Sequence, residues 1–220
     1  MCFSATASFI AGGTLTGMGV ISLKKNNAPR TIAFAAIPLL FGIQQVCEGM
    51  VWLSLMHNPY HSWQPAAVHS FLFFSHGLWP VWVPFSLWLM EPDPRRKQLF
   101  LYAFVLPALG MCLYELWHMF AYPAVAIIEQ HHIVYQLGLP EPFKSISEPV
   151  YGVFAILPCF LSGIKKIWWF GMALLVSEVV SAAWYHSAMV SVWCFFAAVL
   201  SLVILFVLPR TGTKPRPGSS

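Results

Sequence analysis

Charged residues are scarce in this chain. Of its 220 residues only 9% are Asp, Glu, Lys or Arg, whereas 58% are hydrophobic. A water-soluble domain of this length has too small a core to hide so much apolar surface. The composition therefore argues against a soluble globular protein and predicts an integral membrane protein.

The chain also lacks the cysteine pattern of a disulfide framework or of a CxxC metal site. Its five cysteines lie in or beside apolar stretches, and none lies in a long loop. Cys2 would gain a free amine if Met1 were removed, and could then act as a nucleophile or a ligand. The simpler interpretation is a small residue at a helix start. No lysine lies in the last apolar stretch, which argues against a retinal Schiff base.

Seven apolar runs of roughly 17 to 25 residues fit a hydrocarbon core about 30 Å thick. The first run contains glycines and lacks a basic start, so it predicts a helix rather than a cleaved signal peptide. We expect an all-α polytopic domain over residues 1–209 and a disordered cytoplasmic tail over 210–220. The predicted transmembrane helices are Ala5–Leu23, Ile32–Met56, Ala66–Met90, Leu99–Tyr122, Pro149–Ile164, Ile167–His186 and Ala188–Leu208.

Basic residues cluster in every second connection between these helices, and Lys144 is the only lysine or arginine in the others. The positive-inside rule then places the N-terminus outside and the C-terminus in the cytoplasm. The stretch Ala126–Leu139, in an outer connection, looks amphipathic; we expect an interfacial helix or a lid over the bundle. Similar Lys-Lys, Glu and His spacing in helices 1–3 and 5–7 suggests a 3+1+3 parallel repeat.

Six ionisable side chains lie inside these apolar spans. Burying charge in hydrocarbon is costly, so such groups usually face the bundle interior, pair with one another or bind a ligand. At about 1.5 Å of rise per residue, most of the six fall in the outer half of the membrane, on four different helices. This common depth predicts a pocket that opens outward. The six are Glu48, His76, Glu115, His118, Glu178 and His186.

Glutamate and histidine together are typical of metal sites. Glu115 and His118 form one ExxH half-site, which holds iron or manganese in helical bundles, but Glu178 is followed by Ser181 rather than by a second histidine. A complete di-metal site is therefore excluded. A mononuclear site with an open position, typical of catalytic zinc, is compatible with the remaining residues.

The leading hypothesis is a metal-dependent membrane enzyme, a zinc-type hydrolase of a lipid or another apolar substrate, with iron or manganese as the other candidate metals. Its partners would be the bilayer and a lipid-like small molecule, with no nucleic acid. Glu48 or Glu178 would be the catalytic base that takes a proton from metal-bound water. The predicted metal ligands are His76, His118 and His186, with Glu115 as a ligand or as the group that orients one.

Three alternatives use the same residues. The cluster could be a purely structural hydrogen-bond network. It could carry protons or metal ions through a transporter, with the glutamates protonated in alternation. It could also bind haem between two histidines, His76 with His118 or His186.

The opening MCFSATASF, the segment IPLLFGIQQVCEGMVWL and the segment WPVWVPFSLWLMEP resemble a bacterial family of small membrane proteins of unknown function. The resemblance spans most of the chain and implies a multi-pass protein of the bacterial inner membrane, without implying an activity. A looser likeness is to seven-helix zinc hydrolases of the alkaline ceramidase and adiponectin-receptor type. The chain departs from their pattern at Leu72, where they have serine, and at Val190, where they have histidine.

Overall fold

The computed structural model describes residues 4–26, 28–57, 62–129, 131–138, 140–164, 166–184 and 189–204. The predicted tail 210–220 and the predicted ligand His186 lie outside these residues. Within them, seven helical stretches correspond to the seven predicted helices. Their elements are α1 (Ala5–Lys25), α2 and α3 (Ile32–Ala35 and Ile37–His57), α4 and α5 (Gln64–Leu72 and Trp79–Met90), α6 and α7 (Pro94–Phe100 and Leu106–Ala121), α8 (Glu141–Leu161), α9 (Ile167–Trp184) and α10 (Met189–Leu200).

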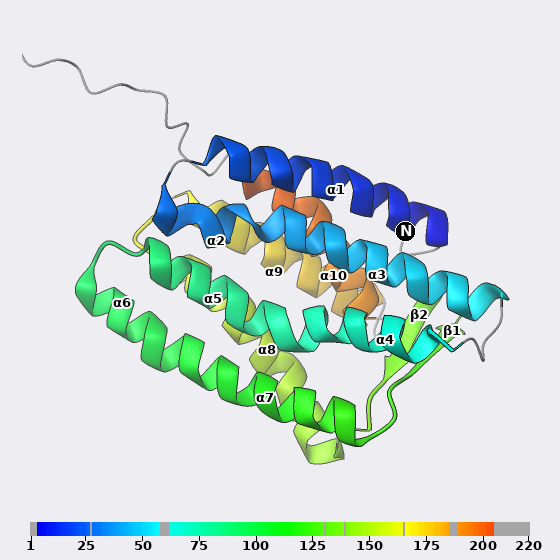
Figure 1. The fold of residues 1–220 in the computed structure, drawn as a ribbon. Helices are drawn as coiled ribbons and strands as arrows, with labels where there is room; N and C mark the ends of the chain where they lie inside the picture. The colour runs from blue at the N-terminus through cyan, green and yellow to red at the C-terminus, as the bar shows by residue number, and fades with distance from the viewer. Residues whose placement is uncertain are drawn as a thin grey trace, which may run out of the picture.

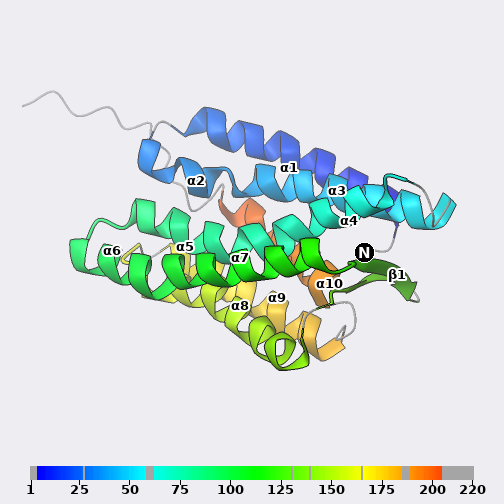
Figure 2. The same cartoon turned by 60° about the horizontal axis from the view of Figure 1, so that its bottom comes forward.

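The helices run along one common direction and form an elongated bundle (Figures 1 and 2). The N-terminal end of α1 and a β-hairpin lie at one end of the bundle. The α1–α2 and α5–α6 connections lie at the opposite end. The α8–α9 connection joins them there, because the Gly163 amide donates to the Glu91 carboxylate at the end of α5 over 3.0 Å. The connections rich in lysine and arginine therefore share one end, hereafter the basic end.

Four of the helical stretches are long and apolar enough to cross a membrane. These are Ala5–Lys25, Pro29–His57, Pro94–Ala121 and Ile167–Trp184. Two further apolar helices, Pro149–Leu161 and Met189–Val203, are shorter. The fold is therefore helical and membrane-like, as the composition predicted, whereas seven crossings, their orientation and the 3+1+3 repeat stay predictions.

Small residues let α1 and α3 approach each other closely. A Cβ added to Gly19 of α1 would overlap backbone atoms of Leu39, and a Cβ added to Gly42 of α3 would lie 2.6 Å from the backbone nitrogen of Thr16. Close backbone approach through glycine is a common way for helices to associate in lipid, where no hydrophobic effect drives them together. These glycines thus fix the position of α3, which carries the polar residues Gln44, Gln45 and Glu48.

Two π-helical turns interrupt the middle helices, at Phe73–Leu78 between α4 and α5 and at Leu101–Val105 between α6 and α7. Each ends two residues before a proline, Pro80 or Pro107. Proline lacks an N–H group and its ring collides with the carbonyl four residues earlier, which for Pro80 is that of His76. Widening the preceding turn relieves this collision, and the Trp79 amide bonds to the carbonyl of Phe74, five residues back. His76 therefore lies in a turn whose shape depends on Pro80.

We expect Pro80→Ala to convert this turn to an α-helical one. A π-helical turn holds about one residue more than an α-helical turn, and each residue corresponds to about 100° of rotation about the helix axis. The conversion should therefore rotate the His76 side chain away from its partner on α7. An experimental structure of the variant should show the His76–Glu115 contact broken. Pro84→Ala is the matched control, since Pro84 lies inside α5 and the turn directly before it is α-helical. An unchanged contact in Pro80→Ala would contradict this explanation.

The segment after α7 forms a β-hairpin, so the expectation of an interfacial helix over Ala126–Leu139 was wrong. Strands β1 (Val125–Glu129) and β2 (His132–Gln136) pair antiparallel, with Ile128 opposite Ile133. Tyr135 stacks on Phe71 of α4 at 4.6 Å between ring centroids. Ala126 and Ile133 are buried in the hydrophobic cluster that closes this end of the bundle. One side of the hairpin is thus packed into the fold.

Two apolar clusters make up most of the core. One lies towards the hairpin and includes Phe71 and Leu72, and the other includes Trp79, Val83 and Phe170. Along the α4–α5 stretch, the residues between Leu72 and Trp79 form the π-helical turn. The polar residues of that turn therefore sit at the junction of the two clusters, where the candidate site lies.

Candidate active site

His76 and Glu115 form a pair between neighbouring helical stretches. His76 Nδ1 lies 3.1 Å from Glu115 Oε2 of α7, and the Glu115 side chain is only 1% exposed. When Glu115 is ionised its carboxylate only accepts hydrogen bonds, and this contact then requires the proton to be on Nδ1. In the neutral ring, Nε2 then holds a lone pair. Glu115 thereby selects the tautomer and fixes the ring of His76.

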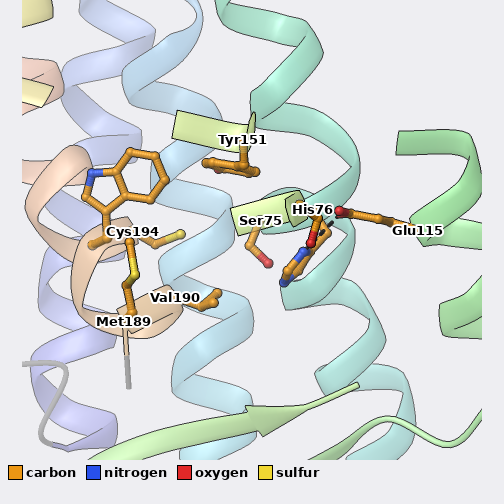
Figure 3. A pocket seen from close by; sticks show the side chains of 9 residues that line it. Ser75, His76, Glu115, Tyr151, Met189, Val190 and Cys194 are labelled. Atoms are coloured by element: carbon orange, nitrogen blue, oxygen red, sulfur yellow. Dashed lines mark hydrogen bonds and ion pairs between the residues drawn. The ribbon is translucent and has the colours of Figure 1, made fainter. Parts of the chain in front are cut away.

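The other ring nitrogen of His76 is available. Nε2 is buried and has no hydrogen-bond partner among the described residues. Figure 3 shows the ring beside a cavity, with Glu115 reaching it from α7 and the α10 residues Val190 and Cys194 on the opposite side. A buried nitrogen without a partner is costly unless water or a ligand fills the space next to it. The ring is thus oriented by one nitrogen and free to react through the other.

The cavity, hereafter the polar chamber, has a volume of about 40 Å³, which is enough for a small polar group or a few waters. Its lining combines the His76–Glu115 pair with hydroxyl and sulfur groups from α8 and α10. The residues that line it are Ser75, His76, Glu115, Ser147, Tyr151, Met189, Val190, Trp193 and Cys194.

His69 contacts the same helix, α7, as His76. His69 Nε2 lies 3.1 Å from the carbonyl oxygen of Met119, one turn along α7 from Glu115. Its Nδ1 lies 2.7 Å from the carbonyl oxygen of Pro65 in its own helix. Carbonyl oxygens only accept and a neutral imidazole carries one N–H, so the tautomer decides which of the two contacts is a hydrogen bond. His69 lies between α4 and α7 beside the pair.

Glu48, predicted as a catalytic base, is fully buried on α3 but does not line the polar chamber. It accepts a hydrogen bond from the hydroxyl of Ser191 on α10. The neighbouring Gln44 accepts one from Trp79 Nε1 over 2.6 Å. Gln44, Gln45 and Glu48 are all buried, so this polar face of α3 lies inside the bundle.

Glu178, the other predicted base, lies on α9 and is half-buried. Its carboxylate packs against Gly152 of α8, where a Cβ would collide with it. It does not line the polar chamber. Each of the three glutamates thus has a different neighbour: a histidine for Glu115, a serine for Glu48 and a glycine for Glu178.

His118, predicted as a metal ligand, is buried among aromatic rings. It stacks on Tyr122 at 5.1 Å and meets the rings of Tyr114 and Trp117 edge-on. His118 does not line the polar chamber, whereas Glu115 does. The two residues of the ExxH sequence therefore lie in different surroundings. In the part of the chain that the structure describes, no three His, Cys, Asp or Glu side chains are grouped to hold a metal ion.

Sequence reasoning missed the contributions of α8 and α10. Tyr151, Trp193 and Cys194 line the polar chamber, yet each looks like an ordinary membrane-helix residue. No spacing pattern marks them, because their role depends on how α8 and α10 are placed against α5. Ser75, next to His76 in sequence, was the one neighbour that the chain order could have indicated.

Comparison with known proteins gives the family. A family model described as a family of unknown function, DUF6629, matches residues 1–219. The chain belongs to the DUF6629 family. The resemblance to a family of unknown function is thereby confirmed over almost the whole chain. No curated protein and no solved structure matches this DUF6629 member.

Proposed function

We propose that this protein is a membrane-embedded hydrolase of a lipid-like substrate, with His76 as the reacting base and Glu115 as the residue that positions it. One observation carries the proposal: a histidine that lines a cavity, whose Nδ1 contacts a buried carboxylate and whose buried Nε2 has no hydrogen-bond partner among the described residues. Carboxylate-oriented histidines of this kind act as general bases in hydrolases on unrelated folds. The apolar surroundings favour an apolar substrate.

The chemistry follows from the two nitrogens. Nε2 takes a proton from a water molecule in the polar chamber while the water oxygen attacks an ester or amide carbon. The imidazolium that forms is stabilised by Glu115 through Nδ1–H. Nε2 then gives its proton to the leaving alcohol or amine as the carbon–oxygen or carbon–nitrogen bond breaks. General acid–base catalysis of this type typically contributes about 10²- to 10⁴-fold to the rate.

A zinc-type version of the same enzyme uses the same lone pair. Histidines that bind metal usually donate their other N–H to a carboxylate, as His76 does to Glu115. Glu115 would then orient the ligand rather than bind the metal. The remaining ligands would have to include residues outside the described part of the chain, such as His186. The general-base version needs no further ligand, and the geometry supports it better.

Purified protein in nanodiscs, incubated with a bacterial lipid extract, tests the proposal by mass spectrometry of the products. We expect hydrolysis products from the natural chain and from His57→Gln, an exposed control, and none above background from His76→Gln. A chelator should leave the activity unchanged in the general-base version. In the zinc version it should abolish activity, and elemental analysis should find one metal ion per chain. Full activity in His76→Gln, or no product from the natural chain, would overturn the proposal.

A proton-coupled carrier remains the second candidate. The observation that favours it is Glu48, which is completely buried, hydrogen-bonded to Ser191 and flanked by Gln44 and Gln45. Proton flux into liposomes that is lost in Glu48→Gln but kept in His76→Gln would favour the carrier over the hydrolase. The haem hypothesis stays a prediction, for which a Soret band in purified protein is the test.

We also propose that all seven helical stretches cross the bacterial inner membrane, with the hairpin end outside and the basic end in the cytoplasm. Two features support this: the connections alternate between the ends of the bundle, and lysine and arginine gather at one of them. Fusion of reporters that are active on only one side of the membrane, placed after α3 and after α5, should give opposite results.

A further inference from the structure

An open groove runs between α9 and α10 on the surface of the bundle. It has a volume of about 600 Å³, within the range of sites that hold small molecules in proteins. Phe196 of α10 and Val203, in the short turn after α10, line one side. The other lining residues follow one another along α9 in steps of one, three or four, so they share one face of that helix. They are Trp169, Met172, Ala173, Val176, Ser177 and Val180.

The lining suits hydrocarbon. It contains no charged side chain and one hydroxyl group, that of Ser177. This hydroxyl donates to the carbonyl oxygen of Leu174 over 2.7 Å and accepts from Trp193 Nε1 over 3.1 Å, so it is already engaged. Trp169 and Val176 are exposed, and α9 is long and apolar enough to cross a membrane. An acyl chain of the bilayer can therefore enter this open groove sideways.

The length of the groove matches one leaflet. Trp169 and Val180 lie at its two ends on α9, and eleven steps of about 1.5 Å separate them by about 16 Å. This distance is about half of a hydrocarbon core about 30 Å thick. Lys166, which is exposed, precedes Trp169 by three residues, nearly one helical turn. The groove thus has a cation and an indole ring at its basic end, the pair of groups typical of the headgroup level.

Positive charge dominates this end of the groove. The acidic residues of the basic end are Glu91 and Asp93, and both are engaged elsewhere. Glu91 accepts a hydrogen bond from the Gly163 amide, and Asp93 pairs with Arg96 over 3.7 Å. Lys166 therefore has no acidic partner among the described residues. A negatively charged headgroup is the complementary ligand.

We infer that the groove binds one acyl chain of an anionic phospholipid whose phosphate group lies beside Lys166. The inference goes beyond the proposed hydrolase, because the groove and the polar chamber share no lining residue. It rests on the proposed orientation only in naming the leaflet, the cytoplasmic one. Lipid tails are as apolar as the groove, so the hydrophobic effect does not favour the bound chain over the bilayer. Selectivity must therefore come from the headgroup.

Native mass spectrometry of the full chain in detergent tests this selectivity, with phosphatidylglycerol and with phosphatidylcholine of the same acyl chains. We expect one phosphatidylglycerol to stay bound per chain and phosphatidylcholine to bind about fivefold more weakly, the effect of one lysine on an anionic lipid. Lys166→Gln should remove this preference. Arg95→Gln, an exposed cation on α6 at the same end, should keep it. Equal binding of the two lipids, or equal losses in the two variants, would overturn the inference.

Two valines of α9 give a matched test of the location. Val176 and Val179 are 55% and 57% exposed, but only Val176 lines the groove. Val176→Trp should fill the groove and abolish the retained phosphatidylglycerol, whereas Val179→Trp should leave it bound. Ala173→Leu fills the same groove with a smaller side chain, and melting temperatures check that each variant is folded. Retention in both filled variants refutes the inference. A dimer that is lost in Val176→Trp, with no lipid bound to the natural chain, also refutes it and assigns the groove to a second copy.

Discussion

Replacing Gly19 with alanine is expected to destabilise the protein by about 1 to 3 kcal/mol or more, the range of overpacked cores. The new methyl group would overlap the backbone of Leu39, and a backbone cannot move aside as a flexible side chain can. Relief requires α1 to separate from α3 along much of their length. The loss of packing energy should therefore be large for a substitution that adds only one methyl group.

The test replaces the α1 glycines with alanine one at a time and measures the free energy of unfolding of each variant by reversible unfolding in mixed micelles. Gly17→Ala and Gly13→Ala are matched controls, since a Cβ at either position would meet no atom within 4 Å. Alanine is intrinsically the better helix former, so these two should be neutral or slightly stabilising. Gly42→Ala, on the facing side of α3, should resemble Gly19→Ala. Equal stability of Gly17→Ala and Gly19→Ala would show that α1 and α3 are not closely packed.

The helices were predictable because a hydrocarbon core demands long apolar runs, and such runs are visible in any window of the sequence. The structure has Ala5–Lys25 where Ala5–Leu23 was expected, and Gln64 to Met90 where Ala66–Met90 was expected. Boundaries differ by a few residues where caps decide them. Asp93, for example, accepts a hydrogen bond from the Arg95 amide and starts α6 before the apolar run begins.

The hairpin was missed because a short apolar segment has no unique period. Within Val125–Glu129 and His132–Gln136, β-branched residues favour strands, yet the same residues also form one apolar side of a short helix. Packing decides the outcome: Tyr135 finds Phe71, and Ile133 enters the core beside α4. Contacts of that kind join residues more than 60 positions apart and leave no local signal.

Only part of the candidate site could be predicted from the sequence. The cost of burying charge singles out six residues, of which His76 and Glu115 line the polar chamber, and depth along the helices brings these two to a similar level. An ideal helical wheel does not predict which way these side chains point, because the π-helical turns at Phe73–Leu78 and Leu101–Val105 each rotate the side chains that follow. Which glutamate meets which histidine therefore depends on Pro80 and Pro107, through turns that an ideal helical wheel does not contain.

The largest effect on activity is expected from the His76–Glu115 pair itself. His76→Ala should lower kcat/KM for the lipid substrate by about 10²- to 10⁴-fold, the contribution of a general base. Glu115→Gln keeps the size of the side chain but removes the charge that stabilises the imidazolium. Its loss should be of similar size, up to about 10⁴-fold, as when the carboxylate that orients the general-base histidine of the Ser-His-Asp triad is changed to its amide.

The double variant separates a catalytic pair from two independent structural residues. If Glu115 acts only through His76, His76→Ala combined with Glu115→Gln should be no slower than His76→Ala alone, because effects within one unit do not add. Added imidazole should partly restore His76→Ala, since it can occupy the vacated space, and should not restore Glu115→Gln. If the activity losses of the two single variants multiply in the double variant and imidazole gives no rescue, the pair supports the fold rather than the reaction.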